Sequence, residues 1–106
     1  MAVRALNGLK GSFAFEKLTV NGSTGLTATV YHVKSSTNAP DKIAEFATIT
    51  VETDQIRYRL DGVAPDSSTG HLLNINDVLY LNSADDIRNF HAIKVTNQAA
   101  IQVSYA

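Results

Sequence analysis

The residue types that most often carry metal or catalytic chemistry are scattered along this chain. Its three histidines, His32, His71 and His91, each lie on or beside an expected strand, and none stands at the close spacing of a metal-binding motif. Cysteine is absent, which excludes a thiolate nucleophile, a cysteine zinc site and a disulfide framework. We therefore expect no metal and no cofactor.

Serine, histidine and aspartate are frequent enough for a triad, but the G-x-S-x-G turn that exposes a nucleophilic serine is missing. Neither a G-x-G-x-x-G pattern nor a P-loop is present to bind phosphate. Five aspartates could supply oxygen ligands to a structural calcium ion, although their order is not that of a calcium loop and acids at turns and caps have an ordinary structural use. These are Asp61, Asp66, Asp77, Asp85 and Asp86. We expect that the protein is not an enzyme.

A pair of arginines in the segment IRYRLDGVAP, residues 56–65, is the most distinctive pattern. Apolar residues alternate there with Arg57 and Arg59, which predicts a strand with one solvated face, and an Asp-Gly turn followed by Pro65 ends it. One interpretation is a solvated face with acidic neighbours on adjacent strands. The other is that the two planar guanidinium groups anchor a protein–protein interface.

The elements that must hold these side chains are short and rich in β-branched and aromatic residues. No amphipathic helix separates them, which predicts an all-β fold, an antiparallel two-sheet sandwich of Ig-like or jelly-roll-like type with about eight strands. The expected strands span residues 13–20, 26–33, 46–53, 56–60, 72–75, 78–81, 90–95 and 101–105. The expected core comprises Phe15, Val30, Ile49, Val51, Ile56, Tyr58, Leu60, Leu73, Ile75, Leu79, Leu81, Ile93, Val95, Ile101 and Val103.

Turn-forming residues separate the expected strands. The Asn21-Gly22-Ser23 sequence predicts a hairpin, and Asn76-Asp77 can play a similar role less well. Residues 35–42 read as a polar loop. Ser83 followed by acids predicts about one turn of helix.

The first twelve residues differ from the rest, so we divide the chain into an N-terminal segment or arm, residues 1–12, and a single sandwich domain, residues 13–106. Val3, Leu6 and Leu9 are apolar, but glycines interrupt any helix and the residues do not alternate. The segment is either an edge piece packed on its own domain or an extended arm that docks on a neighbouring subunit.

Charge and hydropathy exclude several classes of partner. The formal net charge is -1 with no basic run, which argues against nucleic acid. No apolar stretch is long enough to span a bilayer or to form a signal peptide, so we expect no membrane association and read Met1 as the start of the protein.

Residues 56–73, with the later LYL, FHAIKV and IQVSYA segments, resemble two known settings. One is the small Ig-like module at the end of chitobiases, where a strand runs into a Tyr-x-x-Asp-Gly-x-x-Pro turn. The other is a group of small tailed-bacteriophage virion proteins with an Asp-Gly-x-x-Pro loop, a Phe-x-Ala-Ile strand and a terminal Val-x-Tyr strand. The resemblance covers residues 56–105, and the length of the chain favours the free-standing virion protein.

This resemblance implies a structural protein of the virion, made in the host cytoplasm, and most simply a capsid decoration or cement protein on the outer head surface in many copies. Its partners would be the major capsid protein or other virion proteins. The alternatives are a tail or neck accessory protein and a carbohydrate-binding module. Candidate interface residues are Val3, Leu6, Leu9, Arg57 and Arg59.

Self-association is a separate expectation. The C-terminal segment AIQVSYA carries no charge that would deter pairing with another chain, so we expect it to be an exposed edge strand and the protein to be a homo-oligomer. A trimer is favoured because threefold positions of an icosahedral lattice present three equivalent surfaces.

Overall fold

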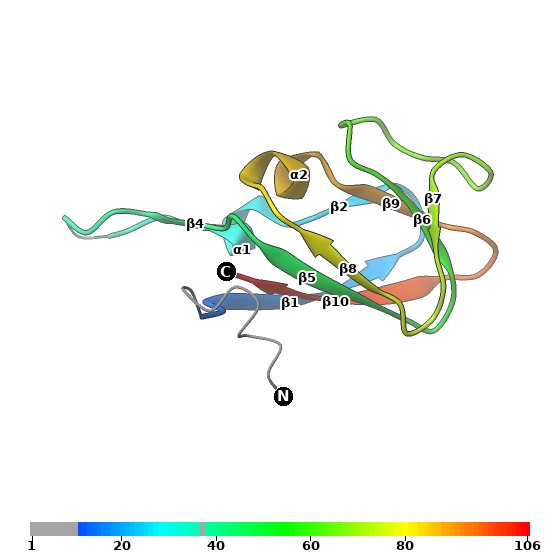
Figure 1. Ribbon diagram of the computed structural model, residues 1–106, viewed down its shortest axis with the longest axis horizontal. Coiled ribbons are helices and arrows are strands. Elements are labelled where there is room, and N and C mark those ends of the chain that lie inside the picture. The colour runs from blue at the N-terminus through cyan, green and yellow to red at the C-terminus, as the bar shows by residue number, and fades with distance from the viewer. Residues whose placement is uncertain (1–10, 37) are drawn as a thin grey trace.

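Two four-stranded antiparallel sheets face each other in the computed structural model, which describes residues 11–36 and 38–106 (Figure 1). The first sheet has the order β1 (Ala14–Val20), β10 (Ala99–Tyr105), β5 (Ala47–Glu52) and β8 (Val78–Leu81). The second has the order β2 (Thr24–Gly25), β9 (His91–Lys94), β6 (Ile56–Arg59) and β7 (His71–Leu73). A two-stranded hairpin, β3 (His32–Val33) with β4 (Lys42–Ile43), and the short helices α1 (Ala28–Tyr31) and α2 (Ala84–Asn89) complete the described elements. The predicted all-β antiparallel sandwich is confirmed.

Most connections cross from one sheet to the other. β1 leads to β2 in the opposite sheet, so the Asn21-Gly22-Ser23 turn does not form the hairpin that the sequence predicts. β7 and β8 also lie in different sheets, and Asn76 between them has the positive φ expected of a turn, 73°. Turn chemistry thus marks where a strand ends without showing which strand it pairs with.

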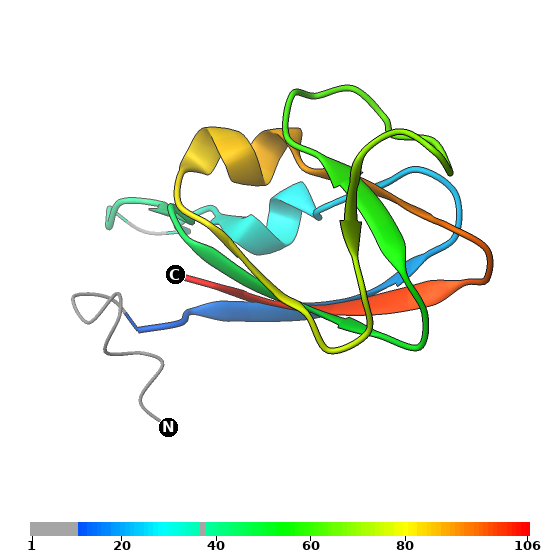
Figure 2. The same ribbon diagram turned by 45° about the vertical axis from the view of Figure 1, so that its right-hand side comes forward.

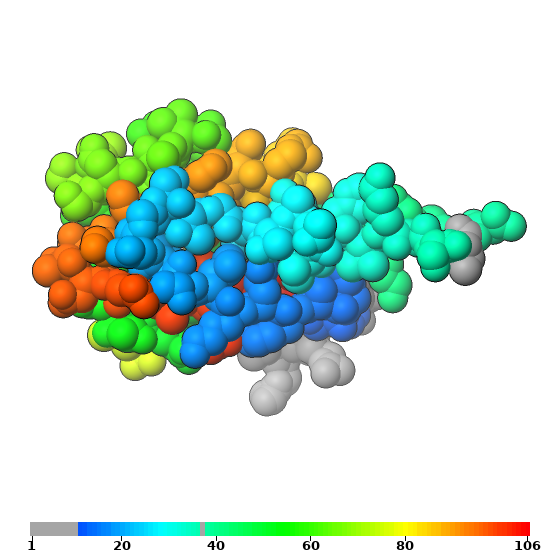
Figure 3. Space-filling model, turned by 180° about the vertical axis from the view of Figure 1, so that it is seen from behind, coloured from blue at the N-terminus to red at the C-terminus, as the bar shows by residue number. Residues whose placement is uncertain are grey.

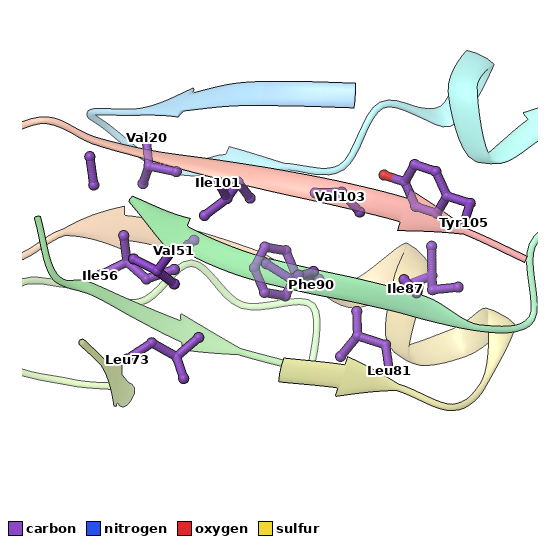
Figure 4. Close-up of a cluster of buried hydrophobic side chains, with 14 of the residues drawn as sticks. Val20, Val51, Ile56, Leu73, Leu81, Ile87, Phe90, Ile101, Val103 and Tyr105 are labelled. Atoms are coloured by element: carbon purple, nitrogen blue, oxygen red, sulfur yellow. The ribbon is translucent and has the colours of Figure 1, made fainter. Parts of the chain in front are cut away.

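The core lies between the sheets and is built from the inward positions of the alternating strands (Figure 4). Seven residues of the expected core are buried: Ile49, Val51, Ile56, Leu73, Leu81, Ile101 and Val103. Six more are half-buried: Val30, Tyr58, Leu60, Leu79, Ile93 and Val95. Ile87 and Phe90, in and just after α2, are also fully buried and were not expected there.

Two expected core residues are exposed, and the prediction for them is wrong. Phe15 has 59% of its surface exposed and Ile75 has 47%. In β1 two adjacent charged residues, Glu16 and Lys17, interrupt the alternation of apolar and polar residues, so the pattern does not show which residues face the core. Assigning the wrong face to one residue of a strand assigns the wrong face to all of them. Glu16 points inward because its carboxylate accepts a hydrogen bond from the buried Tyr105 hydroxyl.

The predicted strand over residues 26–33 is mostly wrong. Its centre forms α1, where the backbone N–H groups of Val30 and Tyr31 both donate to the Thr27 carbonyl. The Tyr31 ring packs on the Tyr105 ring with 6.0 Å between centroids. β-Branched composition favours a strand here, and contacts with distant residues override it.

The expected edge strand at the C-terminus is instead central. β10 pairs with β1 on one side and with β5 on the other, and Ala106 continues the pairing through two hydrogen bonds with Phe46. An uncharged strand is normal at such a position, because no free edge needs protection. The edges of the first sheet are β1 and β8.

The helix predicted at Ser83 is confirmed and is longer than one turn. Ser83 is the N-cap of α2, and its hydroxyl accepts a hydrogen bond from the Asp86 backbone N–H at 3.1 Å. Asp85 and Asp86 occupy the first turn, where the helix dipole favours negative charge. Neither described helix is long and apolar enough to cross a membrane.

Candidate interaction surface

Arg57 holds the loop that follows its own strand. From the outer face of β6, its Nε donates to the Ser67 carbonyl at 3.1 Å and its Nη1 donates to the Gly70 carbonyl at 2.9 Å. Both acceptors lie at the far end of the loop formed by residues 60–70. The planar guanidinium therefore ties the end of this loop back to the strand from which it leaves.

Arg59 holds the start of the same loop. Its Nε and Nη2 donate to the two carboxylate oxygens of Asp61 at 3.0 Å and 2.5 Å. Asp61 also accepts a hydrogen bond from the Val63 backbone N–H at 3.3 Å. The hydrogen bonds from Arg59, and to a lesser extent from Val63, lower the pKa of Asp61 to about 2.

The backbone of the loop fits this arrangement only with glycine at two positions. Gly62 has a φ of +80° and Gly70 a φ of +135°, which side-chain-bearing residues rarely adopt. A Cβ on Gly70 would also lie 3.0 Å from the Pro65 Cβ and 3.1 Å from the Tyr58 carbonyl oxygen. Gly70, which lies outside the Asp-Gly-x-x-Pro motif, thus lets the loop pack closely on β6 and on the Pro65 of that motif.

An open hollow of about 580 Å³ lies beside this loop. Its lining residues are Arg59, Leu60, Asp61, Thr69, Gly70 and His71. A partner that bound either arginine would compete with hydrogen bonds that the arginine makes to its own loop. The structure brings Arg57 and Arg59 together on one face, as the sequence predicts, and gives both a structural use; their role in an interface stays a prediction.

A second exposed element is the hairpin of β3 and β4, which projects from one end of the sandwich (Figures 1 and 3). His32 and Asp41 pair across its base, with 3.0 Å between Nε2 and Oδ2. The other Asp41 oxygen accepts a hydrogen bond from the Ser35 backbone N–H at 2.9 Å. Ser35 and His32 both lower the pKa of Asp41. The sequence interpretation gave this region only as a polar loop and missed the cross-hairpin pair.

The base of the β3–β4 hairpin is partly apolar. Val33 and Ile43 are exposed, and the Lys42 ammonium lies 6.0 Å from the centre of the Phe13 ring. A hollow of about 320 Å³ here is lined by Gly11, Phe13, Asp41, Lys42 and Ile43. The chain thus enters the described structure beside the hairpin. Val3, Leu6 and Leu9 of the expected arm lie outside the described residues.

The three histidines have separate surroundings. His32 pairs with Asp41, the His71 ring lies 5.3 Å from the Tyr58 ring, and His91 Nδ1 lies 3.0 Å from the Asn89 carbonyl oxygen. Within residues 11–36 and 38–106, no group of three or more histidine, aspartate or glutamate side chains is placed to hold a metal ion.

The loop of residues 60–70 and the β3–β4 hairpin are thus candidate contact elements of the described chain. Comparison with known proteins adds no further assignment. No model of a known protein family matches the chain, and no curated protein and no solved structure is significantly similar to it.

Proposed function

We propose that this chain is a structural virion protein of a tailed bacteriophage, a decoration or cement protein that binds the outer head surface in many copies. The resemblance of residues 56–105 to small virion proteins motivates the proposal. The observation that carries it is the projecting β3–β4 hairpin, an exposed contact element on a small sandwich. Its partners are the major capsid protein or other virion proteins, and neither nucleic acid nor membrane is among them.

Attachment through a small element suits a protein present in many copies. Each copy gains modest binding energy, and a repeating lattice multiplies the number of contacts. We place the attachment surface at the end that carries the β3–β4 hairpin, next to the point where residues 1–10 join the described chain. Val3, Leu6 and Leu9 add apolar contacts there in this proposal, and Arg57 and Arg59 flank a separate surface. A trimer at threefold positions stays a prediction. The expected C-terminal edge strand no longer supports self-association, because β10 is a central strand.

Mass spectrometry of purified virions tests the proposal directly. We expect the chain in heads at high copy number. Its absence from virions would contradict the proposal, and a few copies per particle would favour the tail or neck accessory protein instead.

Variants at the two ends of the sandwich test the attachment surface. Asn38→Arg places a bulky charge on an exposed position of the β3–β4 hairpin, and we expect weaker binding to heads that lack the protein. Thr96→Arg is the matched control, because this exposed residue lies in the connection between β9 and β10 at the other end of the molecule (Figure 1). Equal binding by the two variants would show that the β3–β4 hairpin is not the attachment surface.

Removing residues 2–10 tests the expected arm. Because the core cluster lies mainly among residues of the two described sheets and α2, we expect the melting temperature to stay nearly unchanged while attachment to heads weakens. Unfolding of the truncated protein would show that the segment is an integral part of the domain. If the truncated protein attaches to heads as strongly as the full chain does, residues 2–10 do not act as an attachment arm.

A carbohydrate-binding module is the second candidate, and one observation favours it. Phe15 and Tyr80 are both exposed on the outer face of the first sheet, in one row with Ser104 and Thr48. Aromatic rings beside neutral hydroxyl groups suit the apolar faces and hydroxyls of a sugar. A glycan array with no binding by the assembled protein would remove this candidate.

A further inference from the structure

β8 is an edge strand with no charged residue to protect it. It pairs with β5 along one side, from Thr50 opposite Val78 to Ala47 opposite Leu81, and no described strand pairs with its other side. β1, the opposite edge of the same sheet, carries Glu16 and Lys17 within the strand. Charged side chains are a common means of preventing an edge from pairing with another chain, and β8 lacks them.

Exposed apolar side chains occur on both edge strands, β7 and β8, and in the turn between them, Leu72 on the outer face of the second sheet and Val78 and Tyr80 on the outer face of the first. Leu72 on β7, Ile75 in the following turn, and Val78 and Tyr80 on β8 are exposed by 42%, 47%, 46% and 40%. β7 is the edge of the second sheet, so both sheets end on this flank, joined by one turn. In Figures 1 and 2 no segment crosses in front of β8. The flank thus offers free backbone groups together with apolar side chains.

We propose that β8 pairs antiparallel with β8 of a second copy of this chain around a twofold axis. A neutral strand meets no like charge when it pairs with itself, and a twofold axis makes two identical antiparallel strands self-complementary. The pairing joins the first sheets of two copies into one continuous sheet.

The pleat of the strand selects the register. Residues directly opposite each other in an antiparallel pair must point to the same face of the sheet. Val78 and Tyr80 point outward, whereas Leu79 and Leu81 point toward the core. Placing Leu79 opposite its copy on the axis puts Val78 opposite Tyr80 of the second chain, which forms an aromatic and β-branched pair of a kind that stabilises sheets.

A strand of four residues buries little area, so we expect a weak dimer whose population rises with concentration. The mass measured by light scattering over a concentration series should rise from 11.4 kDa toward twice that value. Val78→Lys should keep the protein monomeric at every concentration, because it places like charges beside the axis. Phe15→Lys on β1 is the matched control and should dimerise like the wild type.

Cysteine cross-linking tests the register separately, because the native chain has no cysteine. Val78→Cys and Tyr80→Cys are mixed and oxidised, and we expect disulfide-linked heterodimers in at least about tenfold excess over either homodimer, since only residues directly opposite each other meet disulfide geometry. Phe15→Cys and Val63→Cys, both exposed, give the level of random cross-linking. Mass spectrometry identifies each product.

Three results would overturn the proposal: a monomer at all concentrations, a trimer without the 78–80 cross-link, or heterodimers no more frequent than in the control pair. The proposal does not rest on a role in the virion. If the chain is missing from virions but forms the 78–80 cross-link, the proposed function is wrong and the β8 interface stands.

Discussion

The hydroxyl of Tyr105 donates a 2.5 Å hydrogen bond to Oε2 of Glu16, joining two residues that lie 89 positions apart in the sequence. The backbone N–H of Thr27 donates to the same oxygen at 3.1 Å. One carboxylate therefore connects β1, β10 and the start of α1.

We expect Glu16→Ala to lower the free energy of unfolding by about 1–3 kcal/mol, because it leaves the buried Tyr105 hydroxyl without an acceptor. Tyr105→Phe should cost less, since Glu16 is half-buried and water can replace the lost donor. Lys17→Ala, at an exposed position of the same strand, is the control and should change stability by less than about 0.5 kcal/mol. Urea denaturation measures all three. Equal effects of Glu16→Ala and Lys17→Ala would contradict the structural role of the carboxylate.

The second prediction concerns alkaline pH. Burial, and then the hydrogen bond to Glu16, raise the pKa of Tyr105 well above its ordinary value of 10.0, and burial also raises the pKa of Tyr58. A raised pKa in the folded state gives stability that is complete below the unfolded pKa and is lost as pH rises above it. The free energy of unfolding should therefore fall as pH rises above 10.0, and the fall should be shallower in Tyr105→Phe. Denaturant titrations at pH 9 to 11.5 measure the slope, and identical slopes in the two proteins would contradict the prediction.

Gly70 provides the third prediction. Gly70→Ala should lower the free energy of unfolding by about 1–3 kcal/mol, because φ is positive and the new Cβ would press on the Tyr58 carbonyl and on Pro65. Gly22→Ala is the matched control: φ is not positive there, nothing lies within 4 Å of the added Cβ, and the change should stay within about 1 kcal/mol. Thermal unfolding of both variants decides the comparison, and similar melting temperatures would show that the loop can move away from β6.

The fourth prediction is the titration of Asp61. Carbon-detected NMR should give this carboxyl a pKa of about 2, and Arg59→Gln should return it toward the ordinary value of 3.8. Because the folded pKa is lowered, the pair contributes stability above pH 3.8, and this contribution is lost as pH falls toward 2. An unchanged titration in Arg59→Gln would show that the guanidinium does not hold the carboxylate in solution.

Local patterns in the sequence predict most elements of this fold but little of how they are arranged. Alternation and turn residues locate β5, β6 and β8, and a serine followed by acids locates α2, because these signals depend on adjacent residues. The inward face of β1 depends on a tyrosine near the end of the chain, and the helical turn of α1 depends on contacts with β1 and β10. Such information is distributed over distant positions and does not appear in a local pattern.

In the candidate site, too, the sequence predicts local features and does not predict contacts between distant residues. The sequence predicts that Arg57 and Arg59 share a face, because residues two apart on a strand point the same way. It does not predict that Ser67, Gly70 and Asp61 occupy their donors, since the path of the loop depends on the packing of Gly70 against β6. The β3–β4 hairpin was missed because His32 and Asp41 stand nine residues apart on either side of a loop.

The central position of β10 has a consequence for how the chain folds. β10 is the strand that joins β1 to β5, so β1 has no described partner in the first sheet until residues 99–105 are available. During synthesis β1 must wait for a partner made some eighty residues later, and closing so long a loop is entropically costly. We therefore expect the first sheet to assemble slowly and only after β10 leaves the ribosome, and a premature stop just before residue 99 leaves β1 and β5 without the strand that joins them.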